Sequence, residues 1–225
     1  MKLKSVAFVS VLGFWTAFTL AGSVWVWLFL LGPNSITRLD LIRSNNILVL
    51  LIVALTVFLC GGGLWGLGIA RLMNADATSM VIACALSWSA TVFTFAGAIS
   101  FWGISLGSLS QLAYILPYFP HSHHYSFLLI FVPVIGIVTA INGYVVTGKL
   151  GFKELRKSVG LYAGLAAALG FLTVGLILLF GLGWGVGERP GKMLSLLELC
   201  NIGAALAGGM ALGWALNKSR IRLDG

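Results

Sequence analysis

The sequence predicts an all-α integral membrane protein, a bundle of six transmembrane helices forming a single domain over residues 1–225. The first observation is composition: 59% of the residues are hydrophobic and 9% are charged, whereas soluble domains carry about 25% charged residues. The second is that apolar runs of about 20 residues, long enough to cross the hydrocarbon core of a bilayer, recur along the chain. The sequence therefore predicts that lipid surrounds most of the chain.

The first predicted span covers residues 6–31 and follows a short basic start with Lys2 and Lys4. A secretory signal has a similar beginning, but its apolar core is only about 7–15 residues long. The run ends in tryptophans and then Gly32-Pro33, a pattern typical of a membrane interface followed by a helix stop. We expect an uncleaved helix.

The second predicted span covers residues 47–69, and the third covers residues 79–104 after a short turn. The third is the most polar, with Ser87, Thr91 and Thr94 at helical spacing on one face. Hydroxyl groups on such a face either bond their own backbone or a neighbouring helix, or line a solvated path. The sequence leaves both interpretations open.

The loop over residues 105–126 contains His121, His123 and His124 and no Lys, Arg, Asp or Glu. Imidazole groups suit Zn²⁺ or Cu²⁺, so these histidines form a candidate metal site. The spaced second ligand group of structural zinc sites is not visible. A solvated loop is the alternative interpretation.

The fourth, fifth and sixth predicted spans cover residues 127–146, 159–184 and 193–216. The fourth contains Pro133, which removes a helix hydrogen bond and predicts a kink. It also contains Asn142, a polar residue at membrane depth. We therefore include Asn142 among the candidate functional residues.

The sixth span contains Glu198, the one acidic residue inside a predicted span, with Asn201 on the same face. A carboxyl group at this depth suits proton or cation binding during a transport cycle. Alternatively, Glu198 lies close enough to the helix start to reach the interface or to pair with Arg189 or Lys192.

The distribution of basic residues predicts that both termini are cytoplasmic and that the protein lies in the cell membrane. With six spans, ten Lys and Arg residues fall on the side of the termini and four on the other side. Positive charge is enriched in cytoplasmic loops. The net charge of +8 is thereby explained by topology, and nucleic-acid binding is rejected.

The chain also suggests an inverted repeat of two three-helix halves, residues 1–104 and 126–217. A shift of 119 positions without a gap places Trp65-Gly66 on Trp184-Gly185, together with several small and aliphatic matches. Three spans per half would invert the second half in the membrane, as in many carriers. Chains rich in Leu, Gly and Ala also match themselves by chance, so composition is the competing explanation.

Motifs for catalysis are absent from the sequence, so we predict that the protein is not an enzyme. It has no Ser-His-acid set, no paired carboxylates and no HExxH motif. Cys60, Cys84 and Cys200 lie in apolar runs without a CxxC spacing, which favours buried thiols over a disulfide framework. No cofactor is indicated.

Two functions fit this sequence. The first is a small permease- or channel-like protein that moves a small solute or ion between the two halves, through polar side chains contributed by Glu198, Asn201, Ser87, Thr91, Thr94 and Asn142. The second is a non-catalytic structural or assembly subunit of a larger membrane complex. Its small-residue helix faces would then pack against a membrane partner or a second copy. A membrane-embedded enzyme using the histidine loop is the least favoured class.

Overall fold

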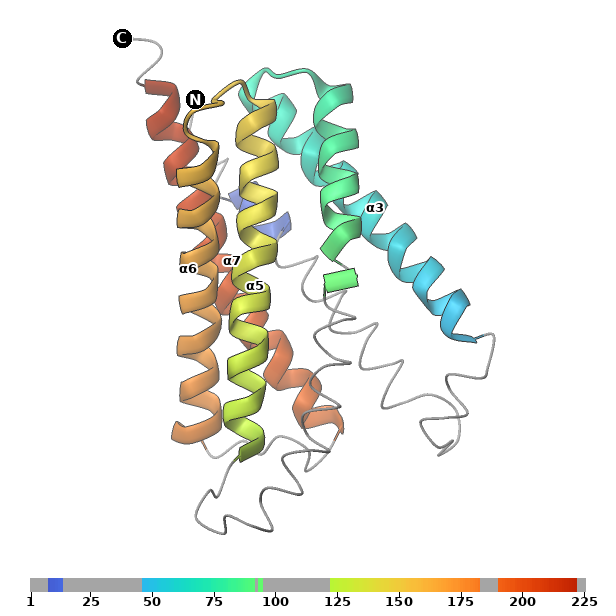
Figure 1. Cartoon of the computed structure of the whole chain (residues 1–225), viewed down its shortest axis with the longest axis vertical. Helices are drawn as coiled ribbons and strands as arrows, with labels where there is room; N and C mark the ends of the chain where they lie inside the picture. The colour runs from blue at the N-terminus through green and yellow to red at the C-terminus, as the bar shows by residue number, and fades with distance from the viewer. Residues whose placement is uncertain (1–7, 14–45, 92, 95–121, 183–189, 222–225) are drawn as a thin grey trace.

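The computed structural model describes residues 8–13, 46–91, 93–94, 122–182 and 190–221, and this described part contains helices and turns but no strand. Four helices carry labels in Figure 1: α3 (Asn46–Met73), α5 (Ser122–Lys149), α6 (Arg156–Leu176) and α7 (Pro190–Ile221). α6 continues into the π-helical turn η1 (Ile177–Gly181). Two further helical segments are Ala77–Thr91 and residues 8–13. These six segments match the six predicted helices.

Within the described residues, three helices are long and apolar enough to cross a membrane. They are Leu128–Lys149, Arg156–Gly181 and Leu196–Lys218, with 22, 26 and 23 residues. Phe58–Met73 and Ala77–Thr91 are shorter apolar helices. The predicted spans four to six therefore correspond to helices, whereas 20 of the 26 residues of predicted span one and 11 of the 26 residues of predicted span three lie outside the described residues.

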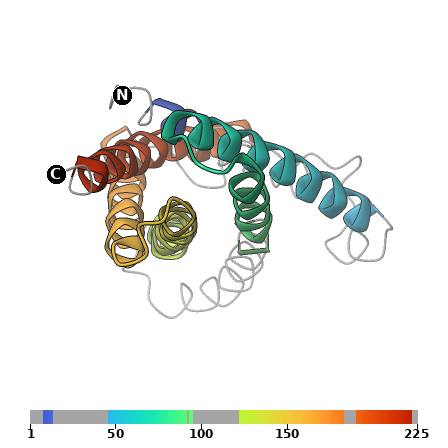
Figure 2. The same cartoon turned by 90° about the horizontal axis from the view of Figure 1, so that it is seen from above.

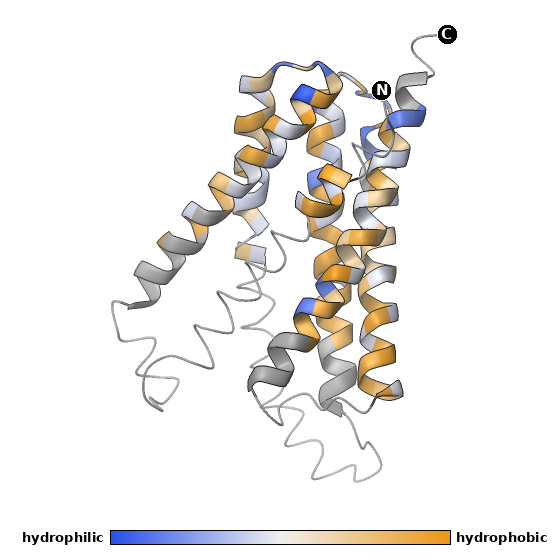
Figure 3. Cartoon of the chain, turned by 180° about the vertical axis from the view of Figure 1, so that it is seen from behind, coloured by the Kyte–Doolittle hydropathy of each residue, from blue (hydrophilic) through white to orange (hydrophobic). Residues whose placement is uncertain are grey.

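α6 has its large apolar side chains outside and its small residues inside. Leu161, Leu165 and Leu169 are 61%, 55% and 61% exposed, and they recur every four residues along one face. The opposite face is buried and consists largely of glycine and alanine. This arrangement is expected for a helix surrounded by lipid, where small residues let helix backbones approach. Figure 3 shows that apolar residues dominate the helices.

Two short turns explain why consecutive helices are antiparallel neighbours. Asn74 takes φ 51° after the end of α3, and Asp76 Oδ2 then accepts a hydrogen bond from the backbone N–H of Ser79 (2.9 Å), which caps the next helix. Gly151 takes φ +87° after α5, a conformation that glycine adopts without strain. Both turns lie at the same end of the molecule as the end of α7 (Figure 1).

α5, α6 and α7 form one tightly packed group, with α6 beside both of the others (Figure 2). A Cβ atom added at Gly160 would lie 2.6 Å from the carbonyl oxygen of Ala140 in α5. A Cβ atom added at Gly203 of α7 would lie 2.7 Å from the carbonyl oxygen of Gly170 in α6. These glycines therefore permit direct contact between helix backbones. We call α5, α6 and α7 the three-helix group.

α3 and the Ala77–Thr91 helix form a second group, which we call the helix pair. A Cβ atom at Gly62 would lie 2.7 Å from the carbonyl oxygen of Cys84. The rings of Trp65 and Trp88 pack beside this contact with centroids 5.3 Å apart. A Cβ atom at Gly66, one helical turn further on, would lie 2.8 Å from the carbonyl oxygen of Met80, so both glycines permit tight packing within the chain.

Residues 8–13 contact both groups. A Cβ atom at Gly68 of α3 would lie 3.1 Å from Val9 Cγ1, and one at Gly209 of α7 would lie 2.6 Å from the backbone nitrogen of Val11. This short helical segment therefore connects the helix pair to the three-helix group.

The predicted inverted repeat stays a prediction. In the ungapped shift of 119 positions, the turn at residues 74–76 coincides with residues 193–195, which lie inside α7. That register therefore does not superimpose the helix boundaries. The Trp184-Gly185 pair on which the match depends lies outside the described residues.

Candidate functional site

A buried hydrogen bond joins the helix pair to the three-helix group. Ser87 Oγ, on the Ala77–Thr91 helix, donates to Asn142 Oδ1 on α5 at 2.8 Å. Asn142 Nδ2 in turn donates to the carbonyl oxygen of Val138 at 3.0 Å. Both side chains are buried. The structure thus brings together two of the predicted functional residues from spans three and four.

The other predicted hydroxyl groups of this region bond their own helix. Thr91 Oγ1 donates to the carbonyl oxygen of Ser87 at 3.4 Å, and Thr94 Oγ1 donates to that of Ala90 at 3.1 Å. Thr91 is buried one helical turn after Ser87, whereas Thr94 is only partly buried. These hydrogen bonds are of the kind expected for hydroxyl groups that bond their own backbone or a neighbouring helix, and a solvated path along this face stays a prediction.

Thr139 is a buried polar residue that the sequence analysis did not select. It lies three positions before Asn142 on α5, and its Oγ1 is buried without a hydrogen-bond partner. Its methyl group faces α7, because a Cβ atom at Gly208 would lie 3.2 Å from Thr139 Cγ2. The signal that identifies it is helical spacing from Asn142.

A second polar contact between the two groups lies nearer the end of the molecule. Lys149 Nζ, in the last turn of α5, donates to Ser79 Oγ at 3.0 Å, and this pair is exposed. Asn142 precedes Lys149 by seven residues, or about 10 Å along a helix. The buried and exposed polar contacts therefore follow the same boundary between α5 and the Ala77–Thr91 helix.

Glu198 and Asn201 do not join the Ser87–Asn142 contact. Asn201 is fully buried beside Cys200, whose Sγ would lie 3.6 Å from a Cβ atom at Gly175 of α6. Asn142, by contrast, is beside Gly143, which faces Gly160 of α6. Gly160 and Gly175 are fifteen residues apart on α6, or about 22 Å. Asn142 and Asn201 therefore lie at different heights along α6. Glu198 is partly exposed.

The candidate metal site lies almost entirely outside the described residues. His121 is not among them, and only the backbone of His123 and His124 is described, in the first turn of α5. In the side chains that the structure describes, no group of three His, Cys, Asp or Glu residues is placed to hold a metal ion. The histidine site stays a prediction, as does pairing of Glu198 with Arg189 or Lys192.

Among the described residues, Ser87 and Asn142 form the candidate site, at the boundary between the helix pair and the three-helix group. Their side chains can form and exchange hydrogen bonds, but they offer no nucleophile with an adjacent base. Comparison with known proteins finds no matching protein-family model, no matching curated protein and no matching solved structure.

Proposed function

We propose that this chain is an integral membrane protein of the permease or channel type, which moves a small solute or ion along the boundary between its two helix groups. The observation that carries the proposal is the buried Ser87–Asn142 hydrogen bond across that boundary. A polar contact of this kind is costly to bury in lipid unless both partners are satisfied. It would also supply exchangeable hydrogen bonds for a polar solute.

The contrast in packing supports relative motion of the two groups. Within each group, glycines bring backbones into direct contact, as at Gly62 and Gly160. Between the groups, the recorded polar contacts use side chains, which can separate and reform without disturbing a helix. Many carriers work by rigid-body rocking of one bundle against another around a site between them.

The proposed location is the cell membrane, with the basic end in the cytoplasm. Basic residues of the described chain lie in three segments at one end of the molecule: Arg71 in the last turn of α3, Lys153 in the turn after α5, and Lys218 near the end of α7 (Figure 1). That clustering agrees with the positive-inside rule applied to the sequence. Glu198 then lies in the opposite half of α7, where we propose that it binds a proton or cation in the same cycle.

Proteoliposome flux tests the proposal. Purified protein is reconstituted, and entry of protons, K⁺, urea and glycerol is compared with entry into protein-free liposomes. We expect at least one probe to enter faster with protein. Entry of all four at the protein-free rate would contradict the permease proposal.

A reversible crosslink tests whether the solute moves along the boundary between the two helix groups. Ser87→Cys and Asn142→Cys are joined by a short, cleavable thiol reagent, after Ala replaces the three native cysteines. Because the link prevents separation at the boundary, the flux falls at least about tenfold and returns on cleavage. The control joins Leu161→Cys to Leu165→Cys on the exposed face of α6, which leaves the flux unchanged. Flux that is insensitive to the first link would place the path elsewhere.

A non-catalytic subunit of a membrane complex is the second candidate. It is favoured by the fact that Asn142 already uses both its oxygen and its amide nitrogen within the chain, as a static structural residue would. Purification separates the two functions. A subunit requires its partner for a stable, monodisperse particle in detergent, whereas a permease gives that particle alone.

A further inference from the structure

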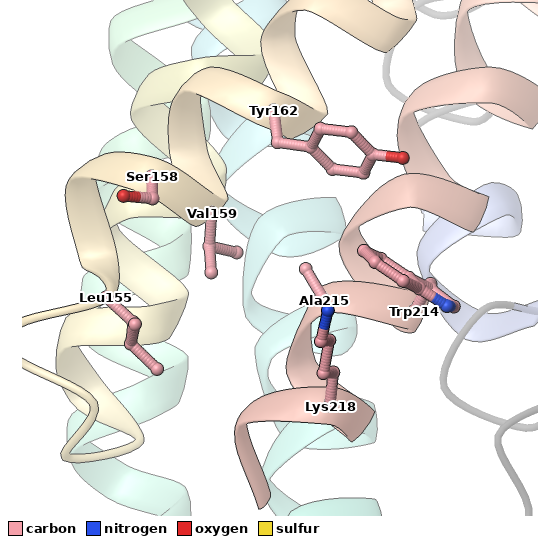
Figure 4. Close-up of a pocket in the computed structure, with 7 residues that line it drawn as sticks. All are labelled: Leu155, Ser158, Val159, Tyr162, Trp214, Ala215 and Lys218. Carbon is pink, nitrogen blue, oxygen red and sulfur yellow. The ribbon is translucent and has the colours of Figure 1, made fainter. Parts of the chain in front are cut away.

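A cavity of about 280 Å³ opens between the first turns of α6 and the last turns of α7. Its walls are mostly apolar and aromatic, and Figure 4 shows that they come from these two helices only. It lies at the basic end of the molecule, far from the Glu198 half of α7. The lining residues are Leu155 at the N-cap of α6, Ser158, Val159 and Tyr162 within α6, and Trp214, Ala215 and Lys218 within α7.

Two aromatic rings form one side of the cavity. The ring centroids of Tyr162 and Trp214 lie 5.7 Å apart with an interplanar angle of 44°. These side chains are 49% and 48% exposed, so each is about half-buried. Tyrosine and tryptophan in this state are typical of the membrane–water interface, where the headgroups lie.

Lys218 places its ammonium group in the cavity region, over the Trp214 ring. Lys218 Nζ lies 4.9 Å from that ring centroid, although Trp214 precedes Lys218 by a full helical turn. A lysine at the cytoplasmic end of a span normally extends outward to water. Here the side chain runs back along α7, toward the span. The ammonium group of this exposed lysine is thereby held beside the aromatic rings of the cavity, where it can pair with an anion.

Most of the described charged residues at this end of the molecule are basic, and of these Lys218 lines the cavity. Arg156 lies over the Tyr144 ring at 4.8 Å, in the turn of α6 that adjoins the cavity. The described residues at this end also include Lys149, Lys153 and Lys157, against the two acidic residues Asp76 and Glu154. Basic pockets between spans on the cytoplasmic side are suited to anionic lipid headgroups.

We infer that this cavity binds an anionic phospholipid, with the phosphate group at Lys218 and an acyl chain against the apolar wall. The charge selects an anion, and the apolar floor formed by Leu155, Val159 and Ala215 selects a ligand with a hydrocarbon part. A free inorganic anion would gain nothing from that floor. The inference rests on the membrane insertion proposed above, but not on transport.

Native mass spectrometry of the detergent-solubilised protein tests the inference. The protein is mixed with equal amounts of phosphatidylglycerol and phosphatidylcholine carrying the same acyl chains, and the retained lipid adducts are compared. We expect phosphatidylglycerol to be retained preferentially. Lys218→Gln lowers that preference about fivefold, the effect of one basic residue at an anionic membrane surface, and Lys218→Arg restores it.

Two further variants separate the cavity from the basic end in general. Lys153→Gln removes the same charge from the exposed turn beyond the cavity and leaves the preference unchanged. Ala215→Leu keeps every charge but fills the apolar floor, and it lowers retention of both lipids. Equal losses in Lys153→Gln and Lys218→Gln would overturn the inference, as would full retention in Ala215→Leu. Far-ultraviolet circular dichroism of each variant shows whether the helices are intact.

Inorganic phosphate serves as the competitor that distinguishes a lipid site from a site for a free anion. Millimolar phosphate leaves phosphatidylglycerol bound if the acyl chain contributes, whereas complete displacement would overturn the lipid assignment. A chain that stays monodisperse without detergent would contradict the membrane proposal. A chain that requires detergent but retains both lipids equally would contradict the lipid inference alone.

Discussion

The contacts within the helix groups differ in kind from the contacts between them. Within the three-helix group, a Cβ atom at Gly164 would lie 2.5 Å from the carbonyl oxygen of Gly136, so two backbones touch. Between the groups, Ser87 and Asn142 meet through side chains. Backbone contacts have one stable arrangement, because no rotamer change relieves them. Side-chain hydrogen bonds can be exchanged, so the boundary is where we propose that the two groups move.

The largest expected effect comes from Gly164→Ala, which tests whether the three-helix group is rigid. The added methyl group would also lie 2.7 Å from Ala140 Cβ, so α5 and α6 must move apart. We expect a loss of about 2–3 kcal/mol in the free energy of unfolding, as for overpacked cores, measured by titration of mixed micelles with sodium dodecyl sulfate.

The matched control for this change is Gly63→Ala. A Cβ atom at Gly63 would meet its nearest neighbour, Val81 Cγ1, at an ordinary 3.5 Å. Since alanine is the better helix former by about 1 kcal/mol, this variant should be as stable as the wild type or more so. Equal effects of the two substitutions would show that Gly164 is not a packing glycine.

The next effect in size concerns the boundary itself, and a double-mutant cycle of Ser87→Ala and Asn142→Ala measures it. Each single change leaves a buried polar partner unsatisfied, at a cost of about 1–3 kcal/mol. The coupling between them should be about 0.6 kcal/mol, the average for hydrogen bonds between membrane helices, and at most about 1.7 kcal/mol. Additive effects of the two substitutions would mean that the hydrogen bond does not hold the groups together.

A smaller effect is expected at the connection made by residues 8–13. Gly209→Ala would bring a methyl group to the backbone of Val11, displacing this segment from α7 while α5 and α6 stay packed. Ser10 is fully buried, so Ser10→Cys is protected from maleimide labelling in a protein where Ala replaces the three native cysteines, of which Cys60 is exposed. Overpacking costs about 1–3 kcal/mol, and a change of about 1 kcal/mol shifts an opening equilibrium roughly fivefold. Gly209→Ala should therefore increase the labelling rate of Ser10→Cys about tenfold or more. Unchanged labelling would show that Gly209 does not hold the segment.

Helix positions were predictable from the sequence because apolar length and turn chemistry are local properties. The predicted span 127–146 lies within α5, and the turn chemistry of Asp76 and Gly151 is visible in the residues themselves. The partner of a polar side chain is a tertiary property. Nothing in the spacing of Ser87 indicates that it meets Asn142, fifty-five residues away.

The same distinction between local and tertiary properties explains why Glu198 and Asn201 do not join the Ser87–Asn142 contact. Glu198 and Asn201 share a helical face, but their depth relative to α5 depends on where α7 begins and on how it crosses α6. α7 begins at Pro190, three residues before the predicted start of span six. The pairing of Lys218 with Trp214 follows from helical spacing, whereas the neighbouring Tyr162 comes from another helix.

The smallest expected effect is that of Lys149→Ala, which removes the exposed polar contact with Ser79 across the same boundary. Water competes for both groups at the surface, so the free energy of unfolding should change by less than about 0.5 kcal/mol. Asn142→Ala breaks a buried contact on the same boundary. The ratio of the two losses in unfolding free energy therefore measures how much burial, rather than hydrogen bonding alone, holds the helix groups together. A loss from Lys149→Ala as large as that from Asn142→Ala would place the principal connection at the basic end of the molecule, and movement would then open the boundary from its other end.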